Sequence, residues 1–221
     1  MSWYRDRILP HIVERAMRAP EFGPVRARVV GGLDGEVLEI GFGSGHNVPH
    51  YPPGVTRVVA VDPATVGRKL AVDRVRQSPV LVEFAGLDAG SLPAPDGSID
   101  HVLSTWTLCT VPDPGQALAE IVRVLRPGGS LRFAEHGLSP DAKVAGWQRR
   151  LTPVQRLVFG GCHLDRPIDE LIRSSGLEVS KLDTYYLPGP KTVGYTFEGE
   201  AAKSQGLRSR RSKKNGESTQ S

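Results

Sequence analysis

The chain has 221 residues and a formal net charge of +4 at neutral pH. This length suits one α/β domain whose core is large enough to fold without disulfide or metal cross-links. Residues 203–221 hold six basic side chains and one acidic side chain, which leaves the rest of the chain near −1. A body with so little net charge does not indicate a nucleic-acid-binding surface, so no specific nucleic-acid partner is expected.

Cysteine usage and hydropathy exclude further classes. Cys109 and Cys162 lie in unrelated sequence contexts, so we expect neither a disulfide framework nor a metal site. No apolar run reaches the roughly 18–20 residues of a membrane span. The first 17 residues carry charges throughout, unlike a secretory signal. These features predict a cytoplasmic protein without a transmembrane segment.

The first 35 residues predict a helical prelude. Apolar residues from Ile8 to Met17 recur near the 3.6-residue period, with arginine and glutamate on the other faces. Pro20 and a turn at residues 22–24 divide the prelude into two pieces.

From residue 36 to residue 202, apolar runs alternate with helical patterns. This alternation predicts a mainly parallel sheet with helices on both faces. The segment 138–165 is poorly periodic and receives no assignment. The predicted strands cover residues 36–41, 56–62, 79–86, 98–106, 130–137, 177–187 and 191–201, and the predicted helices cover residues 64–76, 114–125 and 167–176.

Residues 203–221 predict a disordered basic tail, because their low hydrophobicity and high charge leave almost nothing to bury. A solvated terminus is the favoured interpretation. Weak peripheral contact of the tail with an anionic membrane surface, or with nucleic acid, is the alternative. The oligomeric state has no signature in the sequence.

The turn after the first strand, EIGFGSG, predicts a ligand site between a strand and a helix start. Gly41, Gly43 and Gly45 allow a ligand to approach bare backbone, and parallel sheets bind ligands at the carboxyl ends of their strands. A dinucleotide fingerprint would need a further glycine at position 46, which is a histidine. Glu39 faces the same mouth and suits a cationic ligand group better than a pyrophosphate.

Two acidic residues follow the glycine turn in order. Asp62 ends the second strand, where a carboxylate can accept hydrogen bonds from both hydroxyls of a ribose. Asp88 follows the third strand, where it can accept from an adenine amino group. An ordinary strand-to-helix connection explains the turn alone, but it explains the turn, Asp62 and Asp88 together less well.

Four segments, VLEIGFGSG, VVAVDP, LDAGSLPAPDGSIDHVLST and VLRPGGSLRFAEH, resemble the successive motifs of class I S-adenosylmethionine-dependent methyltransferases, in particular those of the ubiquinone and menaquinone type. Shorter segments, NVPHYPPG, LCTV, EH and GGCHLDR, are similar to methyltransferase-like alkyl-thiol S-methyltransferases. The resemblance implies a Rossmann-like three-layer α/β sandwich. Its seven-stranded sheet would be mostly parallel, with an antiparallel last strand.

The resemblance also implies the cofactor S-adenosylmethionine, the product S-adenosylhomocysteine and a small-molecule methyl acceptor. The implied cofactor-binding residues are Glu39, Gly41, Gly43 and Gly45 at the methionyl portion, Asp62 and Pro63 at the ribose and adenine, Asp88 and Ala89 at the adenine edge, and Thr105 and Trp106 after the fourth strand.

The candidate acceptor residues come from the second half of the chain. His136 ends the fifth strand and is the candidate base or orienting group, with a hydrogen-bonded structural histidine as the alternative. Cys162 and His163 are adjacent and would face opposite ways in an extended segment, so they are not expected to form a thiolate–imidazole couple. Cys109 is expected to be buried and to act as a small apolar residue. The candidate pocket walls are Trp147, Cys162, His163 and Tyr185.

The sequence thus favours a methyltransferase that acts on a hydrophobic small molecule, at a thiol or another heteroatom. The alternatives are a C- or O-methyltransferase of a quinone-like or phenolic substrate and a non-catalytic cofactor-binding module. A nicotinamide-dependent oxidoreductase is weakened by the missing glycine at position 46.

Overall fold

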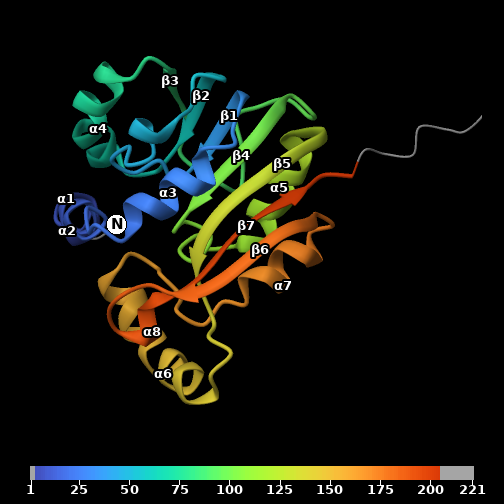
Figure 1. Ribbon diagram of the computed structural model, residues 1–221. Coiled ribbons are helices and arrows are strands. Elements are labelled where there is room, and N and C mark those ends of the chain that lie inside the picture. Colours follow the sequence, from blue (N-terminus) through green and yellow to red (C-terminus); the bar gives the residue numbers. More distant parts are fainter. Residues whose placement is uncertain (1–2, 205–221) are drawn as a thin grey trace, which may run out of the picture.

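Seven strands form one sheet in the computed structural model, which describes residues 3–204 (Figure 1). The strands are β1 (Gly35–Ile40), β2 (Val55–Val61), β3 (Leu81–Gly86), β4 (Ile99–Thr105), β5 (Leu125–His136), β6 (Glu178–Tyr186) and β7 (Tyr195–Ala202). Their order is β3-β2-β1-β4-β5-β7-β6, and β7 runs antiparallel to both of its neighbours. The pairs among β1 to β5 are parallel, so the predicted sheet is confirmed.

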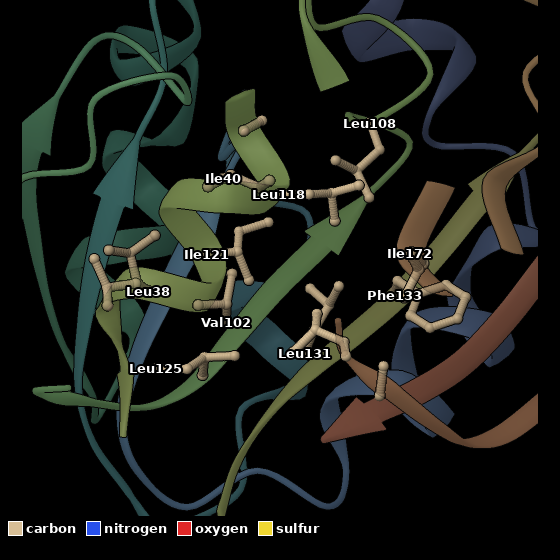
Figure 2. Packing of buried hydrophobic residues seen from close by; sticks show 14 of the residues in the cluster. Leu38, Ile40, Val102, Leu108, Leu118, Ile121, Leu125, Leu131, Phe133 and Ile172 are labelled. Carbon is tan, nitrogen blue, oxygen red and sulfur yellow. The ribbon is translucent and has the colours of Figure 1, made fainter. Parts of the chain in front are cut away.

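Helices cover both faces of this sheet and give three layers (Figure 1). Apolar residues of α3 (Phe22–Val30) and α4 (Thr65–Gln77) pack on one face. Those of α5 (Pro114–Val124) and α7 (Ile168–Ser174) pack on the other face. Figure 2 shows Leu118 and Ile121 of α5 in the cluster that also holds Val102 of β4 and Leu131 of β5.

The central strands are apolar because both of their faces are covered. The last four residues of β1, β2 and β4 are all buried, which is the pattern typical of parallel sheets. The edge strand β3 is only partly buried. The parallel arrangement places the carboxyl ends of β1, β2, β4 and β5 along one edge of the sheet, where the predicted ligand site lies.

The segment 138–165 contains a 17-residue helix, α6 (Ala142–Val158), which the apolar pattern did not predict. Asp141 caps its N-terminus. Trp147, Val154 and Leu157 expose 55%, 60% and 72% of their surface. These exposed apolar residues lie outside the buried stripe and obscure the 3.6-residue period, so the periodicity did not reveal the helix.

The glycine turn leads into η1 (Val48–His50), a single 3-10 turn, rather than into the predicted helix start. Pro49, Pro52 and Pro53 lack the backbone donors that an α-helix would need here. Among the described residues, the first α-helix after β1 is α4, which follows β2. The first turn of α4 lies beside the glycine turn, since a Cβ atom on Gly67 would lie 2.7 Å from Gly43 O.

Two other predicted segments differ from the structure. The predicted turn at residues 22–24 is the first turn of α3, where Pro24 is tolerated because the first N–H groups of a helix have no intrahelical partner. The last strand begins four residues later than predicted, because α8 (Lys191–Gly194) precedes it. A hydrogen bond from Leu187 N to Gly194 O, 2.8 Å long, closes that segment.

Two short helices, α1 (Trp3–Arg7) and α2 (Leu9–Ala16), precede α3, and α2 contacts α4. The predicted tail lies outside the described residues except for Lys203 and Ser204. Lys203 Nζ donates to the carbonyls of Val122 and Leu125 at 2.5 and 2.7 Å, so this residue belongs to the folded body. None of the helices within residues 3–204 combines the length and the apolar character needed to cross a membrane.

Candidate active site

Three glycines in the turn after β1 adopt left-handed backbone conformations. The φ angles of Gly41, Gly43 and Gly45 are +69°, +56° and +76°. A Cβ atom on Gly41 would also collide with the side chain of Thr107, from the loop after β4. The turn is therefore bare backbone held close to that loop, and glycine at position 41 is required by both conformation and space.

Asp62 lies directly after β2 and holds the glycine turn. Its Oδ2 accepts from Gly43 N at 2.7 Å, and its Oδ1 accepts from Ala64 N at 2.6 Å. Burial raises the pKa of Asp62, whereas these backbone hydrogen bonds favour its charged form. Each carboxylate oxygen keeps a second lone pair, so Asp62 can shape the turn and still accept from a ligand hydroxyl.

Glu39 lies beneath the turn and is 1% exposed. It accepts from Asn47 Nδ2 at 2.7 Å and from the Tyr51 hydroxyl. Arg26 of α3 donates to Asn47 Oδ1 at 2.7 Å and to Thr105 Oγ1 at 3.3 Å. Burial raises the pKa of Glu39 to about 7, against the opposing effect of these hydrogen bonds and of the Arg26 charge. Both oxygens of Glu39 are bonded inside the protein, so this carboxylate organises the underside of the turn.

Trp106 follows β4 with a φ angle of +52°, which among the described residues is unique for a non-glycine. Its ring packs edge-on against Phe22 at 4.7 Å between centroids, and Arg26 Cζ lies 4.9 Å from its centroid. Holding a bulky residue in this conformation costs on the order of 1–3 kcal/mol, and such strain gathers at functional sites. Trp106 therefore has a strained backbone at the carboxyl-end edge of the sheet, where Thr107 and the glycine turn also lie.

The other implied cofactor residues lie at neighbouring loop ends. Pro63 and Asp88 are exposed after β2 and β3. Asp88 Oδ1 accepts from Gly90 N at 2.8 Å, and its carboxylate keeps unused acceptor positions. Ala89 packs against the core cluster that includes α5. These positions are accessible at the same edge of the sheet as the glycine turn.

Further along this edge, three chain segments bring together Cys109, His136 and Cys162. His136 Nε2 lies 2.8 Å from Cys162 Sγ, and one donor atom from each of the three residues lies within 4.8 Å of the others. Both cysteines are buried, and His136 is half-buried. Sequence reasoning treated these residues separately, because His136 and Cys162 are 26 positions apart and share no motif with Cys109.

Burial and mutual contact set the ionisation of this cluster. Burial lowers the pKa of His136 to about 4, so its imidazole is neutral near pH 7 and is a weak base. A hydrogen bond between the two sulfurs lowers the pKa of Cys162 and raises that of Cys109. Among the described residues, Nδ1 of His136 is buried and has no hydrogen-bond partner.

Glu135 holds the loop after β4. This loop lies against the glycine turn at Thr107 and carries Cys109 of the cluster. Glu135 is fully buried and accepts from Ser104 Oγ at 2.7 Å, Thr107 N at 3.0 Å and Cys109 N at 3.3 Å. Arg166 donates to a backbone carbonyl of the same loop. The loop after β4 is therefore held at Thr107, Leu108 and Cys109.

Glu14 of α2 joins the N-terminal helices to the glycine turn. Its carboxylate accepts from the Ser44 hydroxyl and from Arg74 Nη2 at 2.9 Å, and Arg74 also donates to Ser44 O at 2.8 Å. Burial alone would raise the pKa of Glu14, but hydrogen bonds from Ser44, Arg74 and Arg18 outweigh it and hold the pKa at about 2. Sequence reasoning missed Glu14 and Arg26, since neither belongs to a recognisable motif.

Trp147, a predicted wall residue, lies on the exposed face of α6. The buried residues of this helix are Ala145, Gln148 and Thr152, which share one face. Position 147 falls on the opposite face, where Arg150 Cζ lies 5.5 Å from the indole centroid. The helical period was not recognised in this segment, so the sequence did not predict that Trp147 lies on the exposed face of a helix.

The other three predicted wall residues lie on two different sides of the site. His163 N donates to Cys109 O at 2.8 Å, which places its backbone beside the cysteine–histidine cluster. Tyr185 of β6 packs in the apolar cluster that includes Trp106, and its hydroxyl donates to Glu198. The structure thus brings Cys162 and His163 to the cysteine–histidine cluster and Tyr185 to the apolar core cluster against which Trp106 also packs.

Comparisons with known proteins connect this geometry to a family. The family described as "Methyltransferase domain" matches residues 38–133. Thiol S-methyltransferase TMT1B of Rattus norvegicus is 35% identical over 176 residues, which are 76% of this chain and 70% of the relative. Thiol S-methyltransferase TMT1A of Homo sapiens is 34% identical over 175 residues, 73% of this chain and 70% of the relative. Demethylmenaquinone methyltransferase of Renibacterium salmoninarum is 37% identical over 107 residues, 48% of this chain and 44% of the relative.

Solved structures share the fold at low sequence identity. The partner of the Trm112 methyltransferase activator in a Haloferax volcanii complex has a TM-score of 0.70 and 19% identity, covering 90% of this chain and 97% of that one. A SAM-dependent methyltransferase from Aquifex aeolicus has a TM-score of 0.60 and 18% identity, covering 87% and 97%.

Proposed function

The chain belongs to the class I S-adenosylmethionine-dependent methyltransferases, and from this premise we propose that it methylates the sulfur of a small hydrophobic thiol. The observation that carries the proposal is how much of the chain aligns with the thiol S-methyltransferases. The family domain spans residues 38–133, whereas the two thiol S-methyltransferases align over 175 and 176 residues. Their likeness therefore extends beyond the cofactor-binding half of the chain into segments that can shape an acceptor site.

The glycine turn fits the cofactor. Bare backbone at Gly41, Gly43 and Gly45 leaves room for the methionyl portion, with Glu39 beneath it, and Asp62 keeps lone pairs for ribose hydroxyls. When bound, the cofactor supplies an electrophilic sulfonium methyl group. The remaining proposed contacts, at the adenine and at the mouth, are Pro63, Asp88, Ala89, Thr105 and Trp106.

The protein's own contribution is to orient the acceptor, because displacement at a methyl carbon needs alignment more than it needs proton transfer. A free thiol has a pKa near 8.5, so a few per cent is already thiolate at neutral pH. A phenol, with a pKa near 10, needs a stronger base. His136 is the proposed catalytic residue, and its neutral, weakly basic imidazole suits a thiol better than a phenol.

A quinone-like or phenolic ring is the second candidate acceptor. The demethylmenaquinone methyltransferase relative supports it, but over less than half of the chain. Acceptors of this kind would place the reaction at carbon or oxygen rather than at sulfur.

An acceptor panel tests the proposal. Hydrophobic thiols and phenols of matched size are incubated with the enzyme and S-adenosylmethionine, and release of S-adenosylhomocysteine is measured. We expect thiols to turn over at least about tenfold faster, since each pKa unit changes the thiolate or phenolate fraction about tenfold. Turnover of phenols or quinones alone would select the second candidate, and cofactor binding without any turnover would select a binding module.

A further inference from the structure

The side-chain cluster of Cys109, His136 and Cys162 has a composition that methyl transfer by alignment alone does not require. Within residues 3–204, it is the group of three metal-ligating side chains whose donor atoms lie close enough to share one ion. Two thiolates and one imidazole form a soft nitrogen–sulfur donor set, which selects zinc among the common divalent ions.

We propose that Cys109 Sγ, His136 Nε2 and Cys162 Sγ bind one Zn²⁺ ion whose fourth coordination position receives the acceptor thiol, so that His136 orients the acceptor through the metal instead of acting as a base. The second half of this inference rests on the proposed thiol acceptor. A site with three protein ligands and an open fourth position is the arrangement of catalytic zinc, whereas structural zinc is closed by four protein ligands.

The donor distances fit this ion after a small movement. Zinc–sulfur bonds of about 2.3 Å and zinc–nitrogen bonds of about 2.0–2.1 Å place neighbouring tetrahedral ligands roughly 3.5–3.8 Å apart. The three donor atoms already lie within 4.8 Å of one another. The contact of 2.8 Å between His136 Nε2 and Cys162 Sγ needs to open by less than about 1 Å.

The surroundings leave the fourth position to a ligand from outside the cluster. The Glu135 carboxylate is bonded to the backbone of Cys109, but its oxygens accept from Ser104 Oγ, Thr107 N and Cys109 N. The backbone of the cysteine loop is further fixed by His163 N, which donates to Cys109 O at 2.8 Å. The ligands thus come from three segments whose backbones are held, as a preformed metal site requires.

The loop after β4 brings the cluster close to the glycine turn in space. Thr107 touches the space that a Cβ on Gly41 would fill, and Cys109 is two residues further on. Two residues of extended chain span at most about 7 Å. A thiol bound at the fourth position would therefore be near the mouth that Gly41 and Trp106 form.

The reaction balances as a displacement. The acceptor RSH binds zinc as a thiolate, because a coordinating thiol is deprotonated, and its proton passes to solvent. The thiolate sulfur then forms a bond to the methyl carbon, while the carbon–sulfonium bond breaks and its electron pair stays on the departing sulfur. The methyl thioether is a neutral, weaker ligand and leaves. Two cysteine thiolates, Zn²⁺ and one acceptor thiolate sum to −1, which attracts a cationic methyl donor.

Metal titration tests the site without using activity. The reduced full-length chain is freed of metal with a chelator and titrated with Co²⁺ and then with Zn²⁺ against a chromophoric chelator. We expect one equivalent to bind, with a thiolate-to-cobalt charge-transfer band and the visible bands of tetrahedral coordination. Cys109→Ser, Cys162→Ser and His136→Ala should each weaken Zn²⁺ binding at least about 100-fold, since even indirect partners of metal ligands contribute 10–100-fold.

His163→Ala is the matched control, because His163 adjoins Cys162 but lies outside the donor cluster. It should leave the metal affinity unchanged, and circular dichroism with S-adenosylhomocysteine titration should show that every variant is folded. A wild-type chain that binds no stoichiometric metal would overturn the proposal.

Acceptor binding is read from the cobalt form. A hydrophobic thiol should shift the visible bands, and a phenol of the same shape should not. An unshifted spectrum would show that the metal is structural and would overturn the acceptor role. If the metal-free chain methylates thiols, the zinc proposal is wrong and the proposed function stands. If the chain binds zinc but methylates only phenols, the thiol acceptor is wrong and the metal site stands.

Discussion

Gly41 shows how a single residue connects two loops of the site. Its φ angle of +69° is unfavourable for any side chain, and the nearest atoms to its missing Cβ belong to Thr107 of the loop after β4. Gly43 shares the backbone conformation, at +56°, but the nearest atom to its missing Cβ is Gly41 O at 3.8 Å. Substitutions at the two positions therefore distinguish the effect of backbone strain from the effect of collision with the neighbouring loop.

Gly41→Ala is expected to weaken S-adenosylhomocysteine binding at least about tenfold, because collision with Thr107 adds to the strain of a left-handed alanine. Gly43→Ala, the matched control, carries the strain without the collision and should lose less. Isothermal titration calorimetry measures both affinities. Equal losses in the two variants would show that backbone strain alone decides.

At the scale of secondary-structure elements, one buried side-chain amide attaches α6 to the segments around it. Gln148 is 1% exposed and donates to Gly137 O at 2.9 Å and to Thr192 O at 3.2 Å. Its Oε1 accepts from Ser139 N at 2.8 Å. This side chain links α6 to the segment after β5 and to α8, and so it supports the segment that follows His136.

Gln148→Ala should lower the free energy of unfolding by about 2–4 kcal/mol, because it leaves buried backbone donors and acceptors without partners. Arg149→Ala, on the exposed side of the same helix, is the control and should change stability by less than about 0.5 kcal/mol. Urea denaturation measures both. A loss below about 1 kcal/mol for Gln148→Ala would mean that water replaces the amide.

At the scale of the whole molecule, Glu14 connects the N-terminal helices to both the glycine turn and α4. Its pKa of about 2 lies below the ordinary value of 4.5. A carboxyl group with a lowered pKa stabilises the fold at pH values above 4.5, and this contribution is lost as the pH falls from about 4.5 toward 2.

Glu14→Gln is therefore expected to be less stable than wild type by about 1–3 kcal/mol at pH 7. The difference should shrink as the pH falls through the window from 4.5 toward 2. Urea midpoints measured at neutral and acidic pH test this, with the exposed Glu170→Gln as the control. A difference that stays constant with pH would assign the effect of Glu14 to packing rather than to its charge.

The sequence by itself determined the sheet and the ligand turn, because both leave local signatures. Strands covered on both faces must be apolar along their length, so β1, β2 and β4 were recognisable as runs. Gly41 was recognisable because a turn with positive φ needs glycine, and Asp62 because its carboxylate directly follows the second strand at the edge where parallel sheets bind ligands.

The tertiary structure alone decided which distant side chains meet. Cys109, His136 and Cys162 each resemble a core or wall residue in their own segment, and they become one cluster only through the order of β4 and β5 and the path of α6. Glu14 reaches the glycine turn in the same way, from a helix that precedes the whole sheet. Such contacts leave no local pattern, because they depend on packing between segments that are far apart in the chain rather than on the spacing of residues within one of them.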